Sequence, residues 1–199
     1  MPEDRYIVTA ALPANKHILQ NIDLHRSSEY LDAINLLTYD FYGPWSSRSG
    51  HQSQLYAMSK DEPSGAGAVS YVMGCGVPGR KILFGIPLFG RSFLHVAGPG
   101  HKNRGFGGNA DGAFDYSLLP RKGTKEQVDK RAVAAQCVGG DGGFVTYDNP
   151  DTVKIKAAFC KEKGLGVSSF VPLCGILVLA DTYTDMTFST GPVLLERSV

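Results

Sequence analysis

The feature of this sequence that most constrains its fold is the alternation of short apolar segments with helical ones. Four segments are rich in β-branched or aromatic residues and are bounded by turn residues, which is typical of buried strands: 6–12, 34–39, 81–86 and 166–173. Helical patterns lie between them, at 27–33, 64–75 and 151–164, with Asp151 as candidate N-cap and Gly164 as candidate C-cap of the last. The order β, α, β, α, β, α, β predicts a parallel sheet covered on both faces, which is either a doubly wound sheet or part of a barrel.

One region breaks this alternation. Residues 97–120 are glycine-rich and polar, 124–137 have a helical pattern, and 143–147 are predicted to be extended. We therefore expect a small α+β insertion at 92–147, with a flexible glycine-rich loop at its start.

Composition excludes several classes of function. The 199 residues carry 20 basic and 19 acidic side chains, spread through the sequence, so no nucleic-acid partner is expected. The longest apolar run, 170–180, is far shorter than the roughly 20 residues that span a bilayer, so no membrane partner is expected either. Isolated cysteines, histidines without HExxH spacing and an incomplete G-x-G-x-x-G pattern predict neither a metal site nor a dinucleotide cofactor.

Polar and aromatic residues follow the second predicted strand, in INLLTYDFYGPW. Tyr39, Asp40, Tyr42 and Trp45 come at the carboxyl end of this strand, the edge at which α/β barrels build their active sites. Aromatic rings next to a carboxylate suit a sugar, because a pyranose offers apolar faces for stacking and hydroxyls for hydrogen bonds. The alternative is that Tyr39 and Trp45 are core aromatics and that Asp40 caps a loop.

The third predicted strand ends in GRSF, which places Arg91 at the same edge of the sheet as Asp40. A guanidinium there can pair with a carboxylate or with a ligand oxygen. The alternative is a plain surface arginine.

Several of these segments together resemble glycoside hydrolase family 18, in particular fungal chitinases. The resemblance rests on YIVTAALPA, INLLTYDFYGPW, SGAGAVSYVMGCGVPGRKILFGIPLFGRSF and FVTYDNPDTVKIKAAFCKEKGLG, which occur in the family's order and cover about residues 5–166. It implies an α/β fold in which residues 1–199 form part of a TIM (β/α)8 barrel, strands five to eight, with the family's α+β insertion after strand seven.

The resemblance also implies an activity. Family members cleave β-1,4-linked N-acetylglucosamine polymers by substrate assistance, in which the acetamido group attacks the anomeric carbon while a glutamic acid protonates the leaving oxygen. Carried over by motif, Tyr39 orients the acetamido group, and Asp40, Tyr42, Trp45 and Arg91 bind substrate. The expected partner is chitin or a chitooligosaccharide, with no cofactor.

This sequence departs from the family pattern in four places, the first of which is Leu37, where the family usually has methionine. It contains no DxxDxDxE motif, whose last residue is the catalytic acid and which we expect on a strand preceding Met1. Phe89 stands where the family usually has tyrosine. The segment 167–199 diverges from the family, with Phe170 and Val171 near the position of its usual tryptophan, and we expect it to form a divergent tail.

Two hypotheses follow from these departures. In the first, the chain is an inactive fragment of a chitinase-like hydrolase; in the second, it is a chitin-binding or interaction protein that kept the sugar-contacting strands without catalysis. Half of a barrel also leaves a sheet edge and apolar faces uncovered, which predicts a marginally stable or self-associating chain. The first residues show no signal peptide, although intact family members are often secreted.

Overall fold

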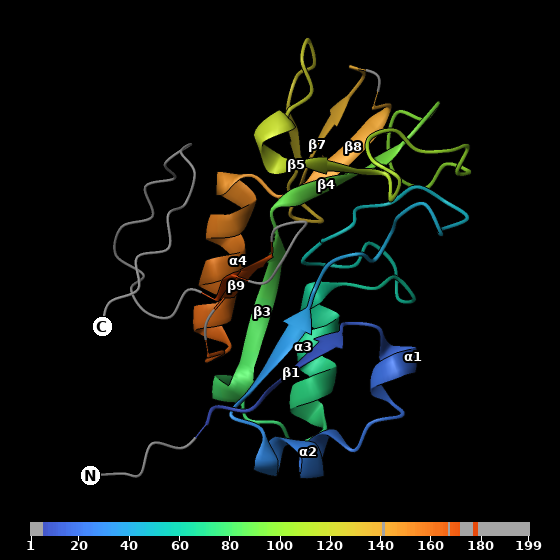
Figure 1. Ribbon diagram of the computed structural model, residues 1–199. Coiled ribbons are helices and arrows are strands. Elements are labelled where there is room, and N and C mark those ends of the chain that lie inside the picture. The colour runs from blue at the N-terminus through green and yellow to red at the C-terminus, as the bar shows by residue number, and fades with distance from the viewer. Residues whose placement is uncertain (1–5, 141, 167, 172–176, 179–199) are drawn as a thin grey trace.

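The computed structural model describes residues 6–140, 142–166, 168–171 and 177–178 and contains two five-stranded sheets (Figure 1). The first sheet has the order β1-β2-β3-β9-β10 and the second the order β5-β4-β8-β7-β6. The first consists of β1 (Thr9–Pro13), β2 (Ala33–Leu37), β3 (Ile82–Pro87), β9 (Ser168–Val171) and β10 (Leu177–Val178). In Figure 1 the second sheet lies above the first, beyond the ends of β2 and β3.

The first sheet has the parallel arrangement of an α/β protein. β1, β2, β3 and β9 pair in parallel, with Ile34 opposite Ile82 and Phe84 opposite Ser168, while β10 pairs antiparallel with β9. The predicted α/β class is confirmed. Most of the expected tail, 167–199, lies outside the described residues.

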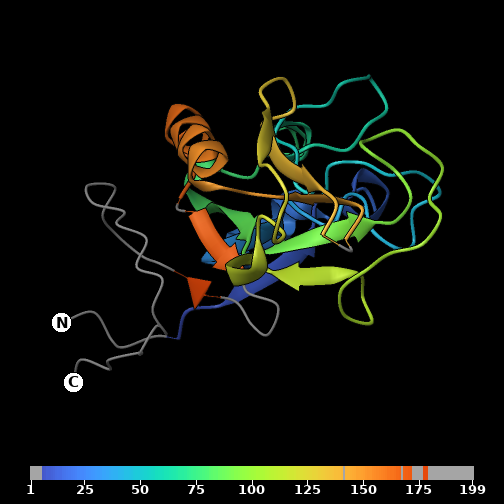
Figure 2. The ribbon, with the colours of Figure 1, turned by 90° about the horizontal axis from the view of Figure 1, so that it is seen from above.

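Two helices cover one face of this sheet. α3 (Gly65–Gly74) and α4 (Pro150–Glu162) contribute Val69, Val72, Phe159 and Cys160 to a core shared with Ile34, Leu36, Ile82, Phe84 and Ile86. Figure 2 shows both helices on the same side of the strands. The sequence led us to expect cover on both faces, but the helices of the described residues cover one, as in a barrel whose helices form an outer layer.

The helix starts follow from local chemistry. Asn149, not Asp151 as predicted, is the N-cap of α4: its side chain accepts from the Thr152 backbone N–H, and the Thr152 hydroxyl accepts in return from the Asn149 N–H. Pro150 then occupies the first helical position, where its fixed φ fits and its missing N–H costs nothing. Asp151 is therefore displaced into the exposed first turn.

The shorter helices also differ from expectation. α2 spans Leu24–Tyr30 rather than 27–33, because the Asp23 side chain caps it by accepting from the Arg26 N–H. A further short helix, α1 (Lys16–Leu19), begins at Asn15 and was not predicted, since four residues give too little periodicity to detect.

The second sheet replaces a predicted helix. It consists of β4 (Phe89–Phe93), β5 (Ala113–Asp115), β6 (Gln127–Asp129), β7 (Ala134–Val138) and β8 (Phe144–Tyr147), so the prediction of a helix at 124–137 is wrong. Residues 127 and 136 pair across an antiparallel β6–β7 hairpin, and β7 in turn pairs with β8. Alanine and valine at helical spacing produced the wrong prediction, and tertiary pairing with β8 overrides it.

β4 continues directly from β3, so one segment passes from the first sheet into the second (Figure 1). The second sheet thus begins at Phe89, within the GRSF-containing strand, rather than at residue 92. Short 3₁₀ turns, at Gly79–Lys81 and Tyr116–Leu118, complete the elements.

Candidate active site

The candidate site is built at the carboxyl ends of β2 and β3. Thr38 follows β2, and its hydroxyl donates to the Gly85 carbonyl of β3 at 2.6 Å, which holds the two strand ends together. The chain then passes through Tyr39 and Asp40 into a loop, while β3 passes into β4.

Asp40 and Arg91 meet at this edge. Arg91 Nε donates to Asp40 Oδ1 at 2.8 Å and Nη2 donates to Oδ2 at 3.0 Å, a bidentate pair, while Nη1 donates to the Asp111 carbonyl at 2.6 Å. The Arg91 side chain is only 8% exposed, so the alternative of a plain surface arginine is wrong. Asp40 has φ of 59°, a left-handed conformation that aspartate tolerates better than most residues.

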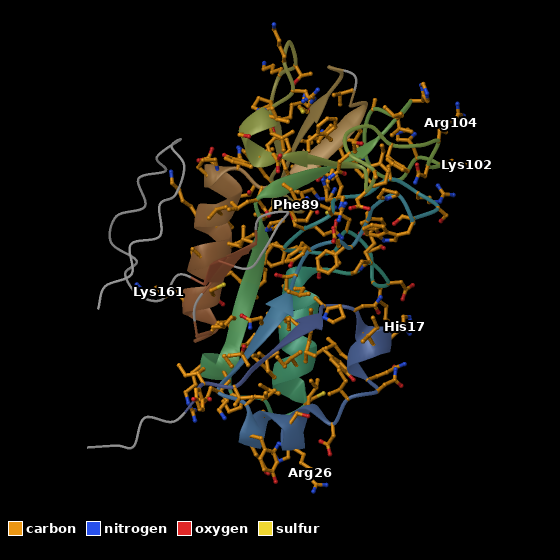
Figure 3. The ribbon with its side chains drawn as sticks, viewed as in Figure 1. His17, Arg26, Phe89, Lys102, Arg104 and Lys161 are labelled. Carbon is orange, nitrogen blue, oxygen red and sulfur yellow. The ribbon has the colours of Figure 1, made fainter. Side chains whose placement is uncertain are left out.

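Aromatic rings enclose the guanidinium. Arg91 Cζ lies 5.1 Å from the Trp45 ring centroid and 4.9 Å from that of Phe89, within cation–π range. Phe89 also packs edge-on against Tyr39, with centroids 5.9 Å apart. Tyr39, Asp40, Trp45, Phe89 and Arg91 thus form one contiguous group, which we call the strand-end cluster. Figure 3 labels Phe89 at the junction of the two sheets.

Trp45 is 60% exposed, so it is not a core aromatic. Its indole folds back over Gly43, where a Cβ would lie 2.5 Å from the ring. Contact with this glycine and with Arg91 fixes the ring while most of its surface faces solvent, which is the arrangement that a stacking platform requires.

Tyr39 is partly buried against β3. A Cβ at Gly85 would lie 3.0 Å from the Tyr39 ring, so the glycine makes room for the phenol. Burial, and secondly the negative charge of Asp40, raises the pKa of Tyr39 to about 12. The hydroxyl therefore stays protonated at neutral pH, and among the described residues it has no hydrogen-bond partner.

Tyr42 lies elsewhere. Its ring packs on Gly50, and burial, with a smaller effect of the Glu62 charge, raises the pKa of its hydroxyl. Within the part of the chain that the structure describes, no hydrogen bond or ring contact joins Tyr42 to the strand-end cluster.

A buried ionic group beneath the loop was not predicted. Lys156 of α4 is fully buried and its Nζ lies 2.6 Å from both carboxylate oxygens of Asp148 and 2.5 Å from the Ser53 carbonyl oxygen. Burial lowers the pKa of Lys156. His51 lies nearby, with Nδ1 3.0 Å from the Thr146 hydroxyl, and burial lowers its pKa as well. These contacts hold the 49–56 segment in place. In the sequence, a lysine in the helix that follows YDNP is the feature that could have pointed to this buried group.

The described residues show neither a cluster of three or more His, Cys, Asp or Glu side chains able to hold a metal ion, nor a helix long and apolar enough to cross a membrane.

The strand-end cluster lies on a TIM-barrel-like α/β fold, and comparison with known proteins shows the family of the chain. The family "Glycosyl hydrolases family 18" matches residues 2–172. The chain belongs to this family.

The relatives include chitinases and oviduct-specific glycoproteins. Chitinase 1 of Aphanocladium album is 31% identical over 175 residues, which cover 83% of this chain and 41% of the relative. Endochitinase 1 of Metarhizium robertsii is 36% identical over 178 residues, which cover 82% of this chain and 40% of the relative. The family 18 chitinase of Cycas revoluta, solved in complex with (GlcNAc)3, superposes with a TM-score of 0.75 at 28% identity, covering 84% of this chain and 51% of that one. The chain thus spans about two fifths of the length of these curated relatives.

Proposed function

We propose that this chain forms the substrate-holding part of a chitin-degrading glycoside hydrolase, and that β1, β2, β3 and β9 correspond to barrel strands five to eight. The observation that carries the proposal is the strand-end cluster itself. It combines a protonated hydroxyl, a fixed carboxylate and an exposed indole within a family whose solved members include complexes with (GlcNAc)3.

Each member of the cluster has a distinct task in this proposal. The Tyr39 hydroxyl, which has no hydrogen-bond partner within the described residues, donates to the acetamido oxygen and orients it for attack on the anomeric carbon. The Asp40 carboxylate, held by Arg91, accepts a hydrogen bond from a hydroxyl of the bound sugar. Trp45 stacks on a neighbouring ring. Tyr42 binds substrate only if an oligosaccharide reaches past Gly50.

Proton donation is a task that the cluster does not perform. A carboxyl group that protonates a leaving oxygen must present an O–H, and both Asp40 oxygens already accept N–H groups from Arg91. The sequence also lacks DxxDxDxE. The chain by itself should therefore bind and orient chitooligosaccharides without cleaving them.

The test is to measure binding and turnover on the same purified chain. We expect saturable binding of an N-acetylglucosamine hexamer and no release of shorter sugars above background. Absence of binding overturns the proposal, and turnover in a chitinase-free preparation overturns the assignment of a purely substrate-holding role.

The pairing of both Asp40 oxygens with Arg91 also favours a second candidate function, that of a chitin-binding protein without catalytic activity. Sequencing transcripts upstream of Met1 separates the two. An in-frame DxxDxDxE segment supports the hydrolase, and a genuine promoter and start codon support the binding protein.

A further inference from the structure

A glycine-rich loop at 98–108 packs along the loop that carries Trp45. Arg48 and Lys102 form an antiparallel bridge, the Asn103 side chain donates to the Pro44 and Ser46 carbonyls at 3.2 and 2.9 Å, and the Ser49 N–H donates to the His101 carbonyl at 2.8 Å. The sequence led us to expect a flexible loop here. These hydrogen bonds instead attach it to the candidate site.

This loop presents Phe106, which is 40% exposed. Its backbone is fixed on both sides: the Leu94 N–H donates to the Gly105 carbonyl at 2.8 Å, and Ser92 Oγ donates to the Gly107 carbonyl at 2.9 Å and accepts from the Gly107 N–H at 2.7 Å. An exposed aromatic on an anchored backbone loses little conformational entropy when a ligand stacks on it.

Phe106 is continuous with Trp45 through Pro44. A Cβ on Gly112 would lie 2.6 Å from Pro44 Cγ and 3.0 Å from Phe106 Cβ, so both side chains lie against this one glycine. Trp45 follows Pro44 in the chain. The exposed apolar surface of the strand-end cluster thus extends over Pro44 to Phe106.

Basic side chains gather on the two loops that carry this surface, and Asp40 and Asp111 lie at its inner end beside Arg91. Segments 41–60 and 92–110 contain no aspartate or glutamate but carry Arg48, Lys60, Lys102 and Arg104. Figure 3 shows Lys102 and Arg104 at the outer end of the loop. Lys102 and Arg104 disfavour a positively charged glucosamine unit at the outer end of this loop, whereas a neutral N-acetylated unit meets no such repulsion.

We propose that Phe106 is a second stacking platform, which extends the sugar-binding surface beyond Trp45 and takes a neutral N-acetylglucosamine unit of a longer chain. This inference rests on the proposed function and names a specificity-determining residue for it. It predicts that Phe106 contributes to affinity for long oligomers and little to affinity for short ones.

The test compares dissociation constants for the N-acetylglucosamine dimer and hexamer by calorimetry, in the wild-type chain, Phe106→Ala, Phe106→Tyr and Leu118→Ala. Leu118 is a matched control because it is an exposed apolar residue, 51% accessible, on the second sheet's 3₁₀ turn. Stacking of one ring corresponds to at least about a fivefold effect. We expect Phe106→Ala to lose that factor or more for the hexamer and less than about twofold for the dimer, Phe106→Tyr to restore it, and Leu118→Ala to match wild type.

A fully deacetylated hexamer at low salt is the second ligand, expected to bind more weakly than the acetylated one. Thermal melts of each variant establish that it is folded. If the wild type binds the hexamer and Phe106→Ala binds it equally well, this inference is overturned alone. If the wild type binds no oligomer, the proposed function falls and this inference with it.

Discussion

Replacing Arg91 with lysine should destabilise the chain and weaken sugar binding together. Arg91 makes two hydrogen bonds to Asp40 and one to the Asp111 carbonyl, and it stacks on Trp45 and Phe89. Lysine keeps the charge but has no planar fork, so it can restore at most part of this set.

The size of the effect follows from these contacts. A hydrogen bond to a charged group contributes about 1.5–3 kcal/mol net, and each cation–π contact about 0.5–1 kcal/mol. Asp40 is one third exposed, so water replaces part of what it loses. We expect the free energy of unfolding to fall by about 2–3 kcal/mol, a shift on the order of 1 M in the urea midpoint.

Urea denaturation followed by circular dichroism measures this, with Arg80→Lys as control because Arg80 is exposed in the 3₁₀ turn before β3. The control should stay within about 0.5 kcal/mol of wild type. A double-mutant cycle with Asp40→Asn should give a coupling energy of about 1–2 kcal/mol. Equal stability of Arg91→Lys and Arg80→Lys, or strict additivity in the cycle, would refute the assignment of this pair.

Three further predictions concern single groups. Tyr39→Phe should weaken hexamer binding about 2- to 10-fold and leave the melting midpoint unchanged, because the hydroxyl has no partner within the described residues; a lower midpoint with unchanged affinity would contradict this. Burial and the Asp40 charge raise the pKa of Tyr39 to about 12, so the phenol stays protonated between pH 8 and 10.5. The ratio of wild-type affinity to Tyr39→Phe affinity for the hexamer should therefore stay constant over this range. A fall in this ratio with a midpoint near pH 10 would argue against the raised pKa. Asp148→Asn should lower the free energy of unfolding by about 3–5 kcal/mol in urea denaturation, because it leaves the Lys156 charge buried and unpaired. The control Asp151→Asn, at an exposed position of the helix that carries Lys156, should have almost no effect. Equal effects of the two substitutions would exclude a structural role for the buried pair.

The sequence was sufficient to predict that Asp40 and Arg91 lie at the same edge of the first sheet, the edge formed by the carboxyl ends of its strands. Parallel strands carry their carboxyl ends to the same side, so a residue just after β2 and one continuing from β3 had to lie near each other. The contact between Trp45 and Arg91 depends on the indole folding over Gly43, which no local pattern encodes.

Other features depended on tertiary contacts. The β6–β7 hairpin has strands of three and five residues whose stability comes from pairing with β8, so a local helical pattern was misleading. Lys156 would be excluded from a core by composition alone, and it is accommodated only because Asp148 and the Ser53 carbonyl meet it there.

The β1 edge of the first sheet, which no other described strand pairs with, bears on how the isolated chain behaves. β1 pairs with β2 alone among the described strands, and Ile7 and Val8 before it are exposed. Such an edge invites pairing with another chain. Self-association in sedimentation experiments is the expected result, and a monodisperse monomer with a sharp cooperative melt would contradict it.

The most direct test of the account uses Trp45, the single tryptophan of the chain, as its own reporter. Titration with an N-acetylglucosamine hexamer should change the tryptophan emission saturably, because the sugar stacks on the indole, and chromatography of the same sample should recover the hexamer intact. An unchanged emission without measurable binding, or cleavage of the hexamer by the purified chain, would contradict a strand-end cluster that holds chitin without hydrolysing it.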